Sequence, residues 1–444
     1  MIKRYSDWVT KISSYFRPAQ LLVLGYLFYL FLAWIILQFP ICHTQKVSTI
    51  DNFFTSASAI STTGLTTVDI GQDYSFCGQV VILLLIQMGG IGYMTFTSFV
   101  ILSVSKTLPK FREEVSLQTY SLPKEFSVPE FIKHVVIYTF ACEVLGSIAL
   151  YFLFKSNQVD HALWQGIFHA ISSFCTAGFS LFSDSLTGFR FNFWVNFVVS
   201  VLCLLGSIGF IVWLDLYKKW TGQKQFVTFS TKIILVLTLS FLVVGTTLFF
   251  FAEESIREFT LYEKIIVSFF QTMSACTTAG FNTLEVSSLF PPNVLILLFL
   301  FTFGASPSGT AGGLKNTTFS TLAGLVNSTL KGRSKIHFWR REIPAKILQM
   351  ATSSFAYYMF LIILSAFILV WLEKLPLESI LFETASALST AGLTMGINSG
   401  LTDSGKILIS LLMFMGRVGI LTFGFAIALK EGTPTLEADN ELIL

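Results

Sequence analysis

Four hexapeptides in the chain follow nearly one pattern: Ser61-Thr62-Thr63-Gly64-Leu65-Thr66, Cys175-Thr176-Ala177-Gly178-Phe179-Ser180, Thr277-Thr278-Ala279-Gly280-Phe281-Asn282 and Ser389-Thr390-Ala391-Gly392-Leu393-Thr394. The consensus is a small residue, Thr, then Thr or Ala, Gly, Leu or Phe, and a polar residue. The four glycines follow one another at intervals of 102 to 114 residues, and each hexapeptide stands between two long apolar stretches. A unit that recurs in this way indicates an internally repeated fold.

The composition is that of a membrane protein. Of the 444 residues, 53% are hydrophobic and only 12% are charged, and 47 are Phe. This balance excludes a soluble globular chain. The first 18 residues are basic and amphipathic and lack the apolar core of a signal peptide, so we expect no cleavable signal.

The apolar stretches are each long enough, at about 20 residues, to cross the ~30 Å hydrocarbon layer of a bilayer. They recur in pairs, at Leu21–Ile41 and Val80–Val104, Phe131–Phe154 and Phe193–Leu216, Thr231–Phe251 and Asn293–Val326, and Ala351–Leu372 and Ile407–Leu429. Between the members of each pair lies a shorter amphipathic segment that runs into a hexapeptide, at Asp51–Ser61, His161–Phe174, Tyr262–Cys276 and Leu377–Leu388. These segments are too short to span and too polar for lipid, so we expect re-entrant pore helices surrounded by protein.

The fold predicted from this order is an all-α membrane protein with four parallel membrane–pore–membrane repeats around one pseudo-fourfold pore. Two spans per repeat return the chain to the same side, so eight spans and four pore helices share one orientation. We place the repeats at 1–104, 105–216, 217–326 and 327–444. The first includes an N-terminal cytoplasmic segment, the third has a broken second span, and the fourth ends in a cytoplasmic tail.

The distribution of charge sets the orientation. Twenty of the 29 Lys and Arg residues fall in the N-terminus, the three loops between repeats with their flanks, and the tail, whereas seven fall on the side of the hexapeptides. The positive-inside rule therefore predicts a multi-pass protein of the cell inner (plasma) membrane with both termini in the cytoplasm. The hexapeptide side carries 14 carboxylates, which could form an acidic vestibule for cations or simply a solvated surface.

The hexapeptides have the composition of an ion filter. Each pore helix aims its partially negative C-terminal end at the centre, and the glycine lets the backbone approach the axis so that carbonyls face an ion. Carbonyls and hydroxyls suit alkali cations. A single Thr-Ala-Gly would be an ordinary turn or helix cap, but four in matching positions favour a ring that removes water from a cation. The predicted filter residues are Thr62, Thr63, Gly64, Thr176, Ala177, Gly178, Thr278, Ala279, Gly280, Thr390, Ala391 and Gly392.

The second spans carry a further repeated pattern, in Gly89-Gly90-Ile91-Gly92, Gly206-Ser207-Ile208-Gly209 and Gly416-Arg417-Val418-Gly419. Tight helix packing between small residues is one interpretation of it. The third repeat departs: its apolar run ends at Phe303, and the glycine- and proline-containing segment Gly304–Asn316 follows. A loop at that depth must line a cavity, so we expect it beneath the filter, where it could plug the pore.

Two cations stand at membrane depth, Lys315 and Arg417. A guanidinium within an apolar span is costly in lipid, so Arg417 is predicted to face the pore as a barrier to cations, to anchor the loop through its carbonyls, or both. Lys315 could instead extend to the cytoplasmic edge. The predicted gate residues are Gly304, Ser306, Gly309, Thr310, Gly312, Gly313, Lys315 and Arg417.

Other polar residues give weaker signals. Glu143 is expected to form a buried hydrogen bond with a neighbouring helix. Cys42 and Cys77 fall on the external side, so a disulfide between them is possible, although sequence cannot supply the geometry. The histidines show no ligand spacing and receive no role. No loop exceeds about 25 residues, so we expect no soluble domain, no enzyme activity, no organic cofactor and no binding of nucleic acid.

The hexapeptides, the loop Gly304–Asn316 and Gly416-Arg417-Val418-Gly419 together resemble the Trk/Ktr/HKT family of potassium transporters. Eight spans without an extra N-terminal pair resemble the bacterial Ktr membrane (ion-translocating) subunit more than the longer Trk type. The resemblance implies a homodimer with one pore per subunit, a cytosolic ring of nucleotide-binding regulatory subunits, and gating by the loop of the third repeat. It also implies that Gly64 goes with K⁺, where Ser would go with Na⁺. Many Ktr members respond to Na⁺, but no residue here marks an Na⁺ site.

Three functions fit these patterns: a gated K⁺ pore for uptake, a secondary transporter that couples K⁺ or Na⁺ to H⁺ or Na⁺, and the ion-translocating subunit of a pump. Parallel repeats, and Glu143 as the one available proton carrier in the spans, argue against the secondary transporter. A pump subunit would need an ATPase partner. The gated K⁺ pore is therefore the preferred interpretation.

Overall fold

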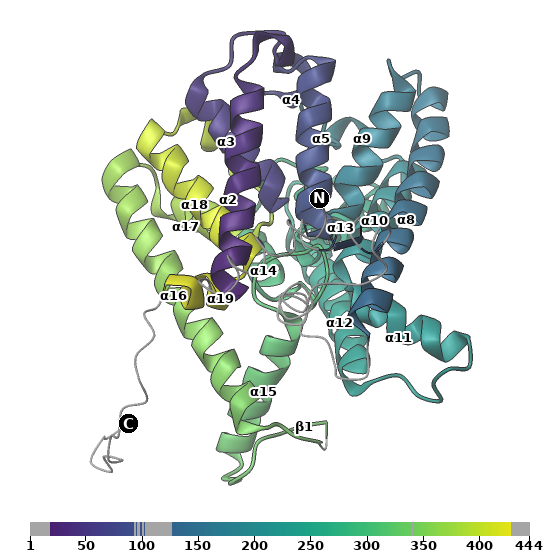
Figure 1. The fold of residues 1–444 in the computed structure, drawn as a ribbon, viewed down its shortest axis with the longest axis vertical. Helices are drawn as coiled ribbons and strands as arrows, with labels where there is room; N and C mark the ends of the chain where they lie inside the picture. Colours follow the sequence, from purple (N-terminus) through teal and green to yellow (C-terminus); the bar gives the residue numbers. More distant parts are fainter. Residues whose placement is uncertain are drawn as a thin grey trace, which may run out of the picture.

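The computed structural model of the chain consists almost entirely of α-helices (Figure 1). It describes residues 18–92, 95, 98, 99, 102, 127–339 and 341–427. The basic segment before residue 18, most of the end of the stretch Val80–Val104, the loop at 105–126 and the tail from Lys430 lie outside these residues. Within the described part, the β-strands are one antiparallel pair, β1 (His337–Phe338) and β2 (Arg341–Glu342), beside an isolated bridge between His43 and Tyr74. The expected class, an all-α membrane protein, is confirmed.

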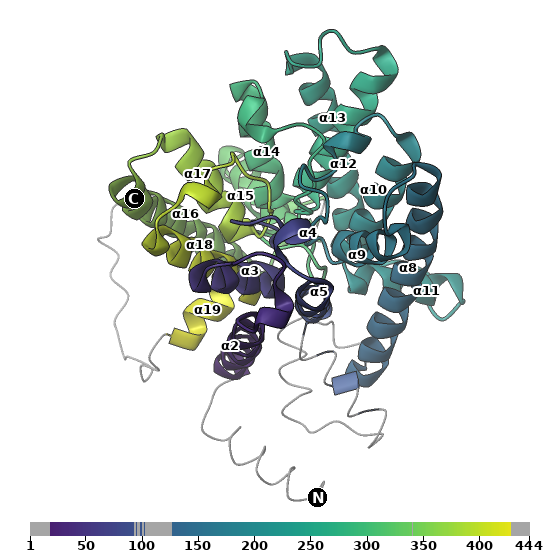
Figure 2. The same cartoon turned by 90° about the horizontal axis from the view of Figure 1, so that it is seen from above.

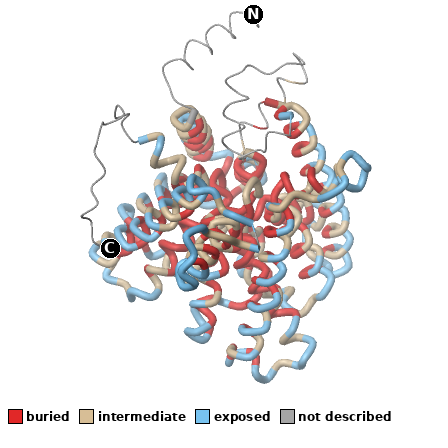
Figure 3. The backbone as a smooth tube through the Cα atoms, turned by 90° about the horizontal axis from the view of Figure 1, so that it is seen from below, coloured by how far each residue is buried: buried red, intermediate tan, exposed pale blue. Residues whose placement is uncertain are grey.

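Among the described residues, four single helices are long and apolar enough to cross a membrane, and they coincide with the first predicted stretch of each pair. They are α2 (Pro18–Leu37), α8 (Val128–Ser156), α12 (Phe229–Ala252) and α16 (Ala345–Glu373). Their outward side chains are large and apolar: Leu145, Phe152 and Phe367 are each more than 60% exposed. Figure 3 shows the buried residues gathered in the middle of the molecule and the exposed ones around it. A continuous apolar exterior of this kind fits a lipid environment.

Four shorter helices end at the hexapeptides, each beginning and ending within two residues of a predicted pore segment. They are α3 (Thr49–Ser61), α9 (Ala162–Phe174), α13 (Leu261–Cys276) and α17 (Leu377–Ser389). Ser48 and Thr260 cap the starts of α3 and α13 by accepting a backbone N–H three residues on, which stabilises the first turn. The sequence therefore located these four helices correctly.

In the second and fourth pairs the second predicted stretch is not one continuous helix, so the prediction of an unbroken span was wrong there. Each of the four second stretches contains a helix of 13 to 16 residues. The helices at these positions are α5 (Phe76–Ile91), α10 (Phe193–Ser207), α14 (Pro291–Phe303) and α18 (Asp403–Val418). After α10 the chain turns by 91° into α11 (Phe210–Trp220), and after α18 it turns by 101° into α19 (Ile420–Ile427). The turns occur at Gly209 and Gly419, whose φ angles of 101° and 95° are open to glycine but not to other residues. The break that the sequence predicted after Phe303 is present, and α15 (Asn316–Leu330) follows the intervening loop.

The helices are arranged as a closed ring. The second helix of one unit packs on the pore helix of the next: α5 on α9, α10 on α13, α14 on α17, and α18 back on α3. Seen from above, these elements follow one another around the molecule in chain order (Figure 2). The last unit thus packs against the first and closes the ring. An ion pair between Lys406 Nζ of α18 and Asp51 Oδ1 of α3, 2.7 Å apart, joins these two units.

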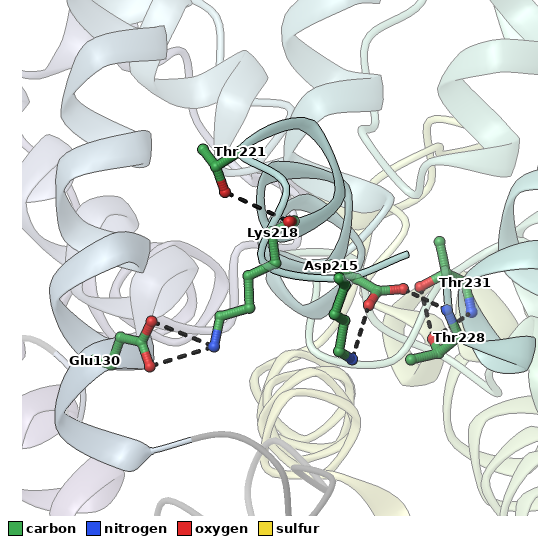
Figure 4. A network of polar contacts seen from close by, with 7 residues as sticks. Glu130, Asp215, Lys218, Thr221, Thr228 and Thr231 are labelled. Carbon is green, nitrogen blue, oxygen red and sulfur yellow. Dashed lines mark hydrogen bonds and ion pairs between the residues drawn. The ribbon is translucent and has the colours of Figure 1, made fainter. Parts of the chain in front are cut away.

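Polar contacts hold the bent helix α11 against its neighbours (Figure 4). Lys218 Nζ lies 3.2 Å from Glu130 Oε1 in the first turn of α8. On the other side of α11, the buried Asp215 pairs with Lys224 and accepts the N–H of Thr228, the residue that caps α12. The turn after α10 therefore ends in a helix whose direction is fixed from both sides.

Candidate functional site

The four hexapeptides share one backbone conformation. The second residue is in the left-handed region each time, with φ of 52° at Thr62, 49° at Thr176, 52° at Thr278 and 49° at Thr390. A β-branched residue adopts this conformation only where its surroundings impose it, and such residues gather at functional sites. The next amide donates a hydrogen bond of 2.8–2.9 Å to the carbonyl of a serine five residues earlier. These serines are Ser58, Ser172, Ser274 and Ser386.

The serines were not among the predicted site residues. All four are fully buried on the pore helices and precede the hexapeptide glycine by six positions. An alignment of the four pore segments with one another would have found them, because the residue type is the same in each.

The four hexapeptide glycines lie in a closed ring of close contacts. A Cβ atom built on Gly64 would fall within 3 Å of the carbonyl oxygen of Ala177. The same holds for Gly178 against Ala279, Gly280 against Ala391, and Gly392 against Thr63. Each glycine thus faces the carbonyl of the next hexapeptide in chain order, and the last faces the first. Side chains are excluded here because backbone occupies the space, so the ring presents peptide oxygens.

Hydroxyl groups lie next to this ring. The Oγ1 atoms of Thr62 and Thr390 are buried and have no hydrogen-bond partner in the part of the chain that the structure describes. A buried hydroxyl without a partner is costly unless something else binds it. Across the same described residues, no group of three His, Cys, Asp or Glu could hold a metal ion. The ligands that the ring offers are neutral peptide and hydroxyl oxygens, a donor set that suits an alkali cation.

The repeated glycines of the second helices give close helix contacts. A Cβ on Gly89, Gly206 or Gly416 would collide with the carbonyl of the residue four positions before the hexapeptide glycine. The tight-packing interpretation is therefore confirmed at these three positions. Gly304 makes the equivalent contact, with the carbonyl of Cys276, so the third unit keeps this contact although its sequence differs afterwards. Gly304 follows the last residue of α14, so this contact is made by the first residue of the predicted loop.

The loop Gly304–Asn316 contacts three of the four hexapeptides. Thr176 Oγ1 donates a hydrogen bond to Thr310 Oγ1, 3.0 Å away, and Thr310 Oγ1 donates to the carbonyl of Phe174. The N–H of Gly312 donates to Thr278 Oγ1 at 3.1 Å. A Cβ on Gly312 would collide with Thr390 Oγ1. The loop therefore lies directly against the threonines that precede the ring glycines. Its place beneath a filter, as a plug of the pore, stays a prediction.

The remaining loop residues of the prediction fix the shape of the loop. Asn316 donates to Ser306 Oγ at 3.1 Å, which joins the two ends of the loop. Gly309 approaches the carbonyl of Ser207, and Gly313 has a φ of 71°. Lys315 Nζ donates to the carbonyl of Ala311 at 2.8 Å, so its ammonium turns back onto the loop.

Arg417 joins three units of the ring. Its guanidinium donates to the carbonyl oxygens of Thr310, Gly89 and Gly90, the last at 3.0 Å. Five donors in a fixed plane allow one side chain to bind carbonyls from several directions. Arg417 also lines a cavity of about 870 Å³ beside the loop. The side chain therefore has both the contacts of an anchor and a position next to open space.

The loop separates the ring from this cavity. The cavity is lined by Ser308, Gly309 and Ala311–Lys315 of the loop, by Gly90–Gly92, and by residues of α2, α16 and α19. No hexapeptide residue of the described chain is part of its lining. A cation that passed the ring in this conformation would meet the loop before it met the cavity.

Two weaker predictions can also be compared with the structure. Gln87 of α5 donates a hydrogen bond of 3.0 Å to Glu143 of α8, so the expected buried contact with a neighbouring helix is confirmed. Cys42 and Cys77 are free thiols, as are the other four cysteines, all of which are described. Burial, and after it the neighbouring Cys77, raises the pKa of the Cys42 thiol to about 11.

Comparison with known proteins identifies relatives along nearly the whole chain. The family model TrkH, described as a cation transport protein, matches residues 29–433. The Ktr system potassium uptake protein B of Bacillus subtilis is 34% identical, over 96% of each chain. The protein of the same name from Vibrio alginolyticus is 30% identical over 93% of this chain and 92% of its own. The potassium/sodium uptake protein NtpJ of Enterococcus hirae is 30% identical over 95% of each.

The fold also has a solved counterpart. The crystal structure of the potassium transporter TrkH from Vibrio parahaemolyticus matches with a TM-score of 0.66. The match covers 86% of this chain and 79% of that one, at 19% sequence identity. The architecture is therefore shared even where few residues are.

Proposed function

The chain belongs to the TrkH family of cation transport proteins, and from this premise we propose that it takes up potassium through a pore whose filter is the ring of four hexapeptides. The observation that carries the proposal is the closed order of glycine–carbonyl contacts, Gly64 to Ala177 and onward to Gly392 and Thr63. Four peptide loops that close on one another can surround a single ion with backbone oxygens.

Selectivity for K⁺ follows from how this ring is built. Carbonyl oxygens held in place replace the hydration shell of a cation of the right size and field strength. The ring contains glycine at all four positions, and each would place a side chain against the neighbouring backbone. The names of the relatives support K⁺ as the substrate, and one also names sodium. The transport assay is to measure whether Na⁺ regulates K⁺ uptake or is itself transported.

The loop Gly304–Asn316 and Arg417 are proposed as the gate. The loop lies between the ring and the cavity, and its contacts with Thr176 and Thr278 are ordinary hydrogen bonds of 3.0 and 3.1 Å that movement could break. Arg417 adds a positive charge to the same place, where a cation would be repelled in a medium of low dielectric constant. The conformation described here is thus proposed as the closed state.

Regulation and assembly are proposed from the family to which the chain belongs and from its distribution of charge. The basic loops between repeats and the tail after Lys430 are the surfaces on which a cytosolic ring of nucleotide-binding subunits would dock. We propose a homodimer with one pore in each subunit, in the cell inner membrane, with both termini in the cytoplasm as the charge distribution indicates. The four units then act as parallel membrane–pore–membrane repeats, with bent second spans.

Flux measurements in proteoliposomes test the central proposal. With K⁺ as the only alkali cation and no second gradient, a pore should carry K⁺ down its own gradient. Flux that stops when a Na⁺ or H⁺ gradient is withheld would instead establish the secondary transporter. Uptake of Na⁺ in equal measure to K⁺ would overturn K⁺ selectivity.

A further inference from the structure

One position on each pore helix holds a fully buried polar side chain that no assigned role explains. It precedes the ring glycine by nine residues, and it is occupied by Thr55, His169, Gln271 and Glu383. All four are 0% exposed. The residue types differ, so no sequence motif marks the position, but the buried polar character is the same in every unit.

Glu383 makes the largest number of the hydrogen bonds formed by these four described side chains. Its Oε1 accepts hydrogen bonds from Thr394 Oγ1 at 2.5 Å and from the N–H of Met395 at 2.7 Å. Its Oε2 accepts from Asn398 Nδ2 at 3.1 Å. Thr394 and Met395 are the second and third residues after Gly392. The carboxylate therefore binds the chain where it leaves the ring, on the side away from the loop Gly304–Asn316.

The direction of these hydrogen bonds calls for a carboxylate at position 383, because it requires acceptors on both side-chain oxygens. The hydroxyl of Thr394 accepts from the N–H of Gly396 and from Asn398 Nδ2, both at 2.9 Å, so its proton is directed at Glu383. All three partners of Glu383 are then donors. A carboxylate offers acceptors on both oxygens, whereas an amide of the same size offers acceptors on one.

Two other units make a related contact. His169 Nε2 lies 2.9 Å from Ser180 Oγ, and Ser180 is the second residue after Gly178. Gln271 Oε1 accepts the N–H of Thr283, the third residue after Gly280, at 3.3 Å. Thr55 is the shortest of the four side chains.

A second anchor lies one helical turn away. Ser386 Oγ donates to the carbonyl of Leu393 at 2.7 Å, and Ser172 Oγ donates to the carbonyl of Phe179 at 2.7 Å. Residues three apart share a helix face. Glu383 and Ser386 therefore bind the consecutive residues Leu393–Met395, which follow the ring glycine, from one side of α17. The strand from Gly392 to Met395 is thus bound to its pore helix at three successive residues.

We propose that Glu383 is a positioning residue of the filter, which acts through Thr394 and Met395 to fix the carbonyls of the fourth hexapeptide. This role rests on the function proposed above. It makes Glu383 the residue on which discrimination of K⁺ from Na⁺ depends at the fourth hexapeptide. Rigidly held oxygens resist collapse around the smaller Na⁺. The equivalent positions in the other three units are Thr, His and Gln, so the four pore helices carry different side chains at this position. Among these four described side chains, only that of the fourth unit is a carboxylate.

The test compares K⁺ and Na⁺ uptake by purified protein in proteoliposomes. Glu383→Gln keeps the size of the side chain and removes one of its acceptors. Thr394→Val keeps the shape of the partner and removes its hydroxyl, and Thr394→Ser restores the hydroxyl. Glu378→Gln, at an exposed position in the first turn of the same helix, is the matched control.

We expect Glu383→Gln and Thr394→Val each to lower the K⁺-over-Na⁺ preference by about tenfold, since charge-assisted hydrogen bonds are strong and buried here. Combining the two should cost little more than either alone, because they remove one link. Thr394→Ser and Glu378→Gln should retain the preference of the unmodified protein. A merely structural role would lower the amount of folded protein and leave the preference unchanged.

Gly64→Ser, measured in parallel, separates this proposal from the filter itself. If Gly64→Ser alters the preference while folded Glu383→Gln and Thr394→Val do not, the positioning role is wrong and the filter stands. If Gly64→Ser has no effect, the hexapeptides are not the filter and both proposals fail. Should Glu383→Gln yield no folded protein, Thr394→Val decides alone, because it leaves the carboxylate in place.

Discussion

Thr176 Oγ1 donates a hydrogen bond to Thr310 Oγ1 across 3.0 Å, and this contact joins the second hexapeptide to the loop of the third unit. Thr310 Oγ1 in turn donates a hydrogen bond to the carbonyl of Phe174, at the end of pore helix α9. Loop and ring therefore share a chain of hydrogen bonds, so displacement of the loop changes the partners of a filter threonine. In the proposed gating, these hydrogen bonds would couple opening of the loop to the geometry of the ring.

Deletion of Thr310–Gly313 should raise K⁺ flux and make it independent of the cytosolic regulator. The deletion removes the residues that contact Thr176 and Thr278, and it opens the way from the ring to the cavity of about 870 Å³. Flux in proteoliposomes, with and without regulator, measures the effect. A folded deletion protein with reduced flux would make the loop a wall of the pore instead of its gate.

Arg417→Gln should raise K⁺ flux and also lower thermal stability. The barrier to a cation falls because a unit charge leaves a pathway of low dielectric constant, an effect of several kcal/mol by order of magnitude. Stability falls by about 1.5–3 kcal/mol, because carbonyls of Thr310, Gly89 and Gly90 lose a charged donor. Flux and thermal unfolding of the same preparation report the two effects separately.

Arg417→Lys provides the control for charge. An ammonium keeps the barrier but cannot bind three carbonyls in a plane, so this variant should lose stability without a gain in flux. Equal flux in all three proteins, with stability lost in both variants, would assign Arg417 a purely anchoring role.

Gly64→Ser should weaken discrimination of K⁺ from Na⁺. The φ angle of 92° at Gly64 is unfavourable for serine, and the new Cβ would collide with the carbonyl of Ala177, which the filter uses. Competition of Na⁺ with Rb⁺ or K⁺ uptake measures the change. Gly222→Ser is the matched control: its φ angle of 75° carries the same backbone cost, but no atom lies within 4 Å of the added Cβ. Equal discrimination in both variants would remove Gly64 from the filter.

The sequence predicted those parts of the molecule that depend on local pattern. The pore helices and the break after Phe303 were found because amphipathic segments, glycines and proline act over a few residues. The bends at Gly209 and Gly419 were missed because a glycine in an apolar run fits close packing as well as a turn, and only tertiary contacts distinguish the two. In the second and fourth units, Gly206 and Gly416 serve close packing, whereas the glycines three residues later, Gly209 and Gly419, serve the turn.

Contacts between distant residues were less predictable. The position of Arg417 at membrane depth indicated that it needs partners, and the structure supplies them from Gly89 and Thr310, more than one hundred residues away. The set around Glu383 had no signal in residue identity, since Thr, His, Gln and Glu share only their polarity. What these four residues share is their position: each is a polar residue nine positions before a ring glycine, on the buried side of its pore helix.

The closure of the ring gives the last prediction. Lys406 Nζ lies 2.7 Å from Asp51 Oδ1, and both side chains are largely buried, with 11% and 15% of their surface exposed. Asp51 stands at the start of α3, outside the spanning helices. Burial acts to raise the pKa of Asp51, but hydrogen bonds from Lys406, Ser48 and Thr67 outweigh it, so the pKa lies below the ordinary value of 3.8.

Asp51→Asn should therefore destabilise the protein at neutral pH by about 2 kcal/mol, between the values typical of exposed and fully buried pairs. A carboxyl group with a lowered folded-state pKa contributes its stability in full above its ordinary pKa and loses it as the pH falls through the lowered one. The difference in thermal unfolding between Asp51→Asn and the unmodified protein should be constant from about pH 8 to pH 5 and shrink toward about pH 3. Glu254→Gln, which breaks the exposed pair with Arg257, serves as the control and should change stability by less than about 1 kcal/mol at any of these pH values. If Asp51→Asn behaves like Glu254→Gln, the ion pair is incidental, and the packing of α18 on α3 closes the ring without it.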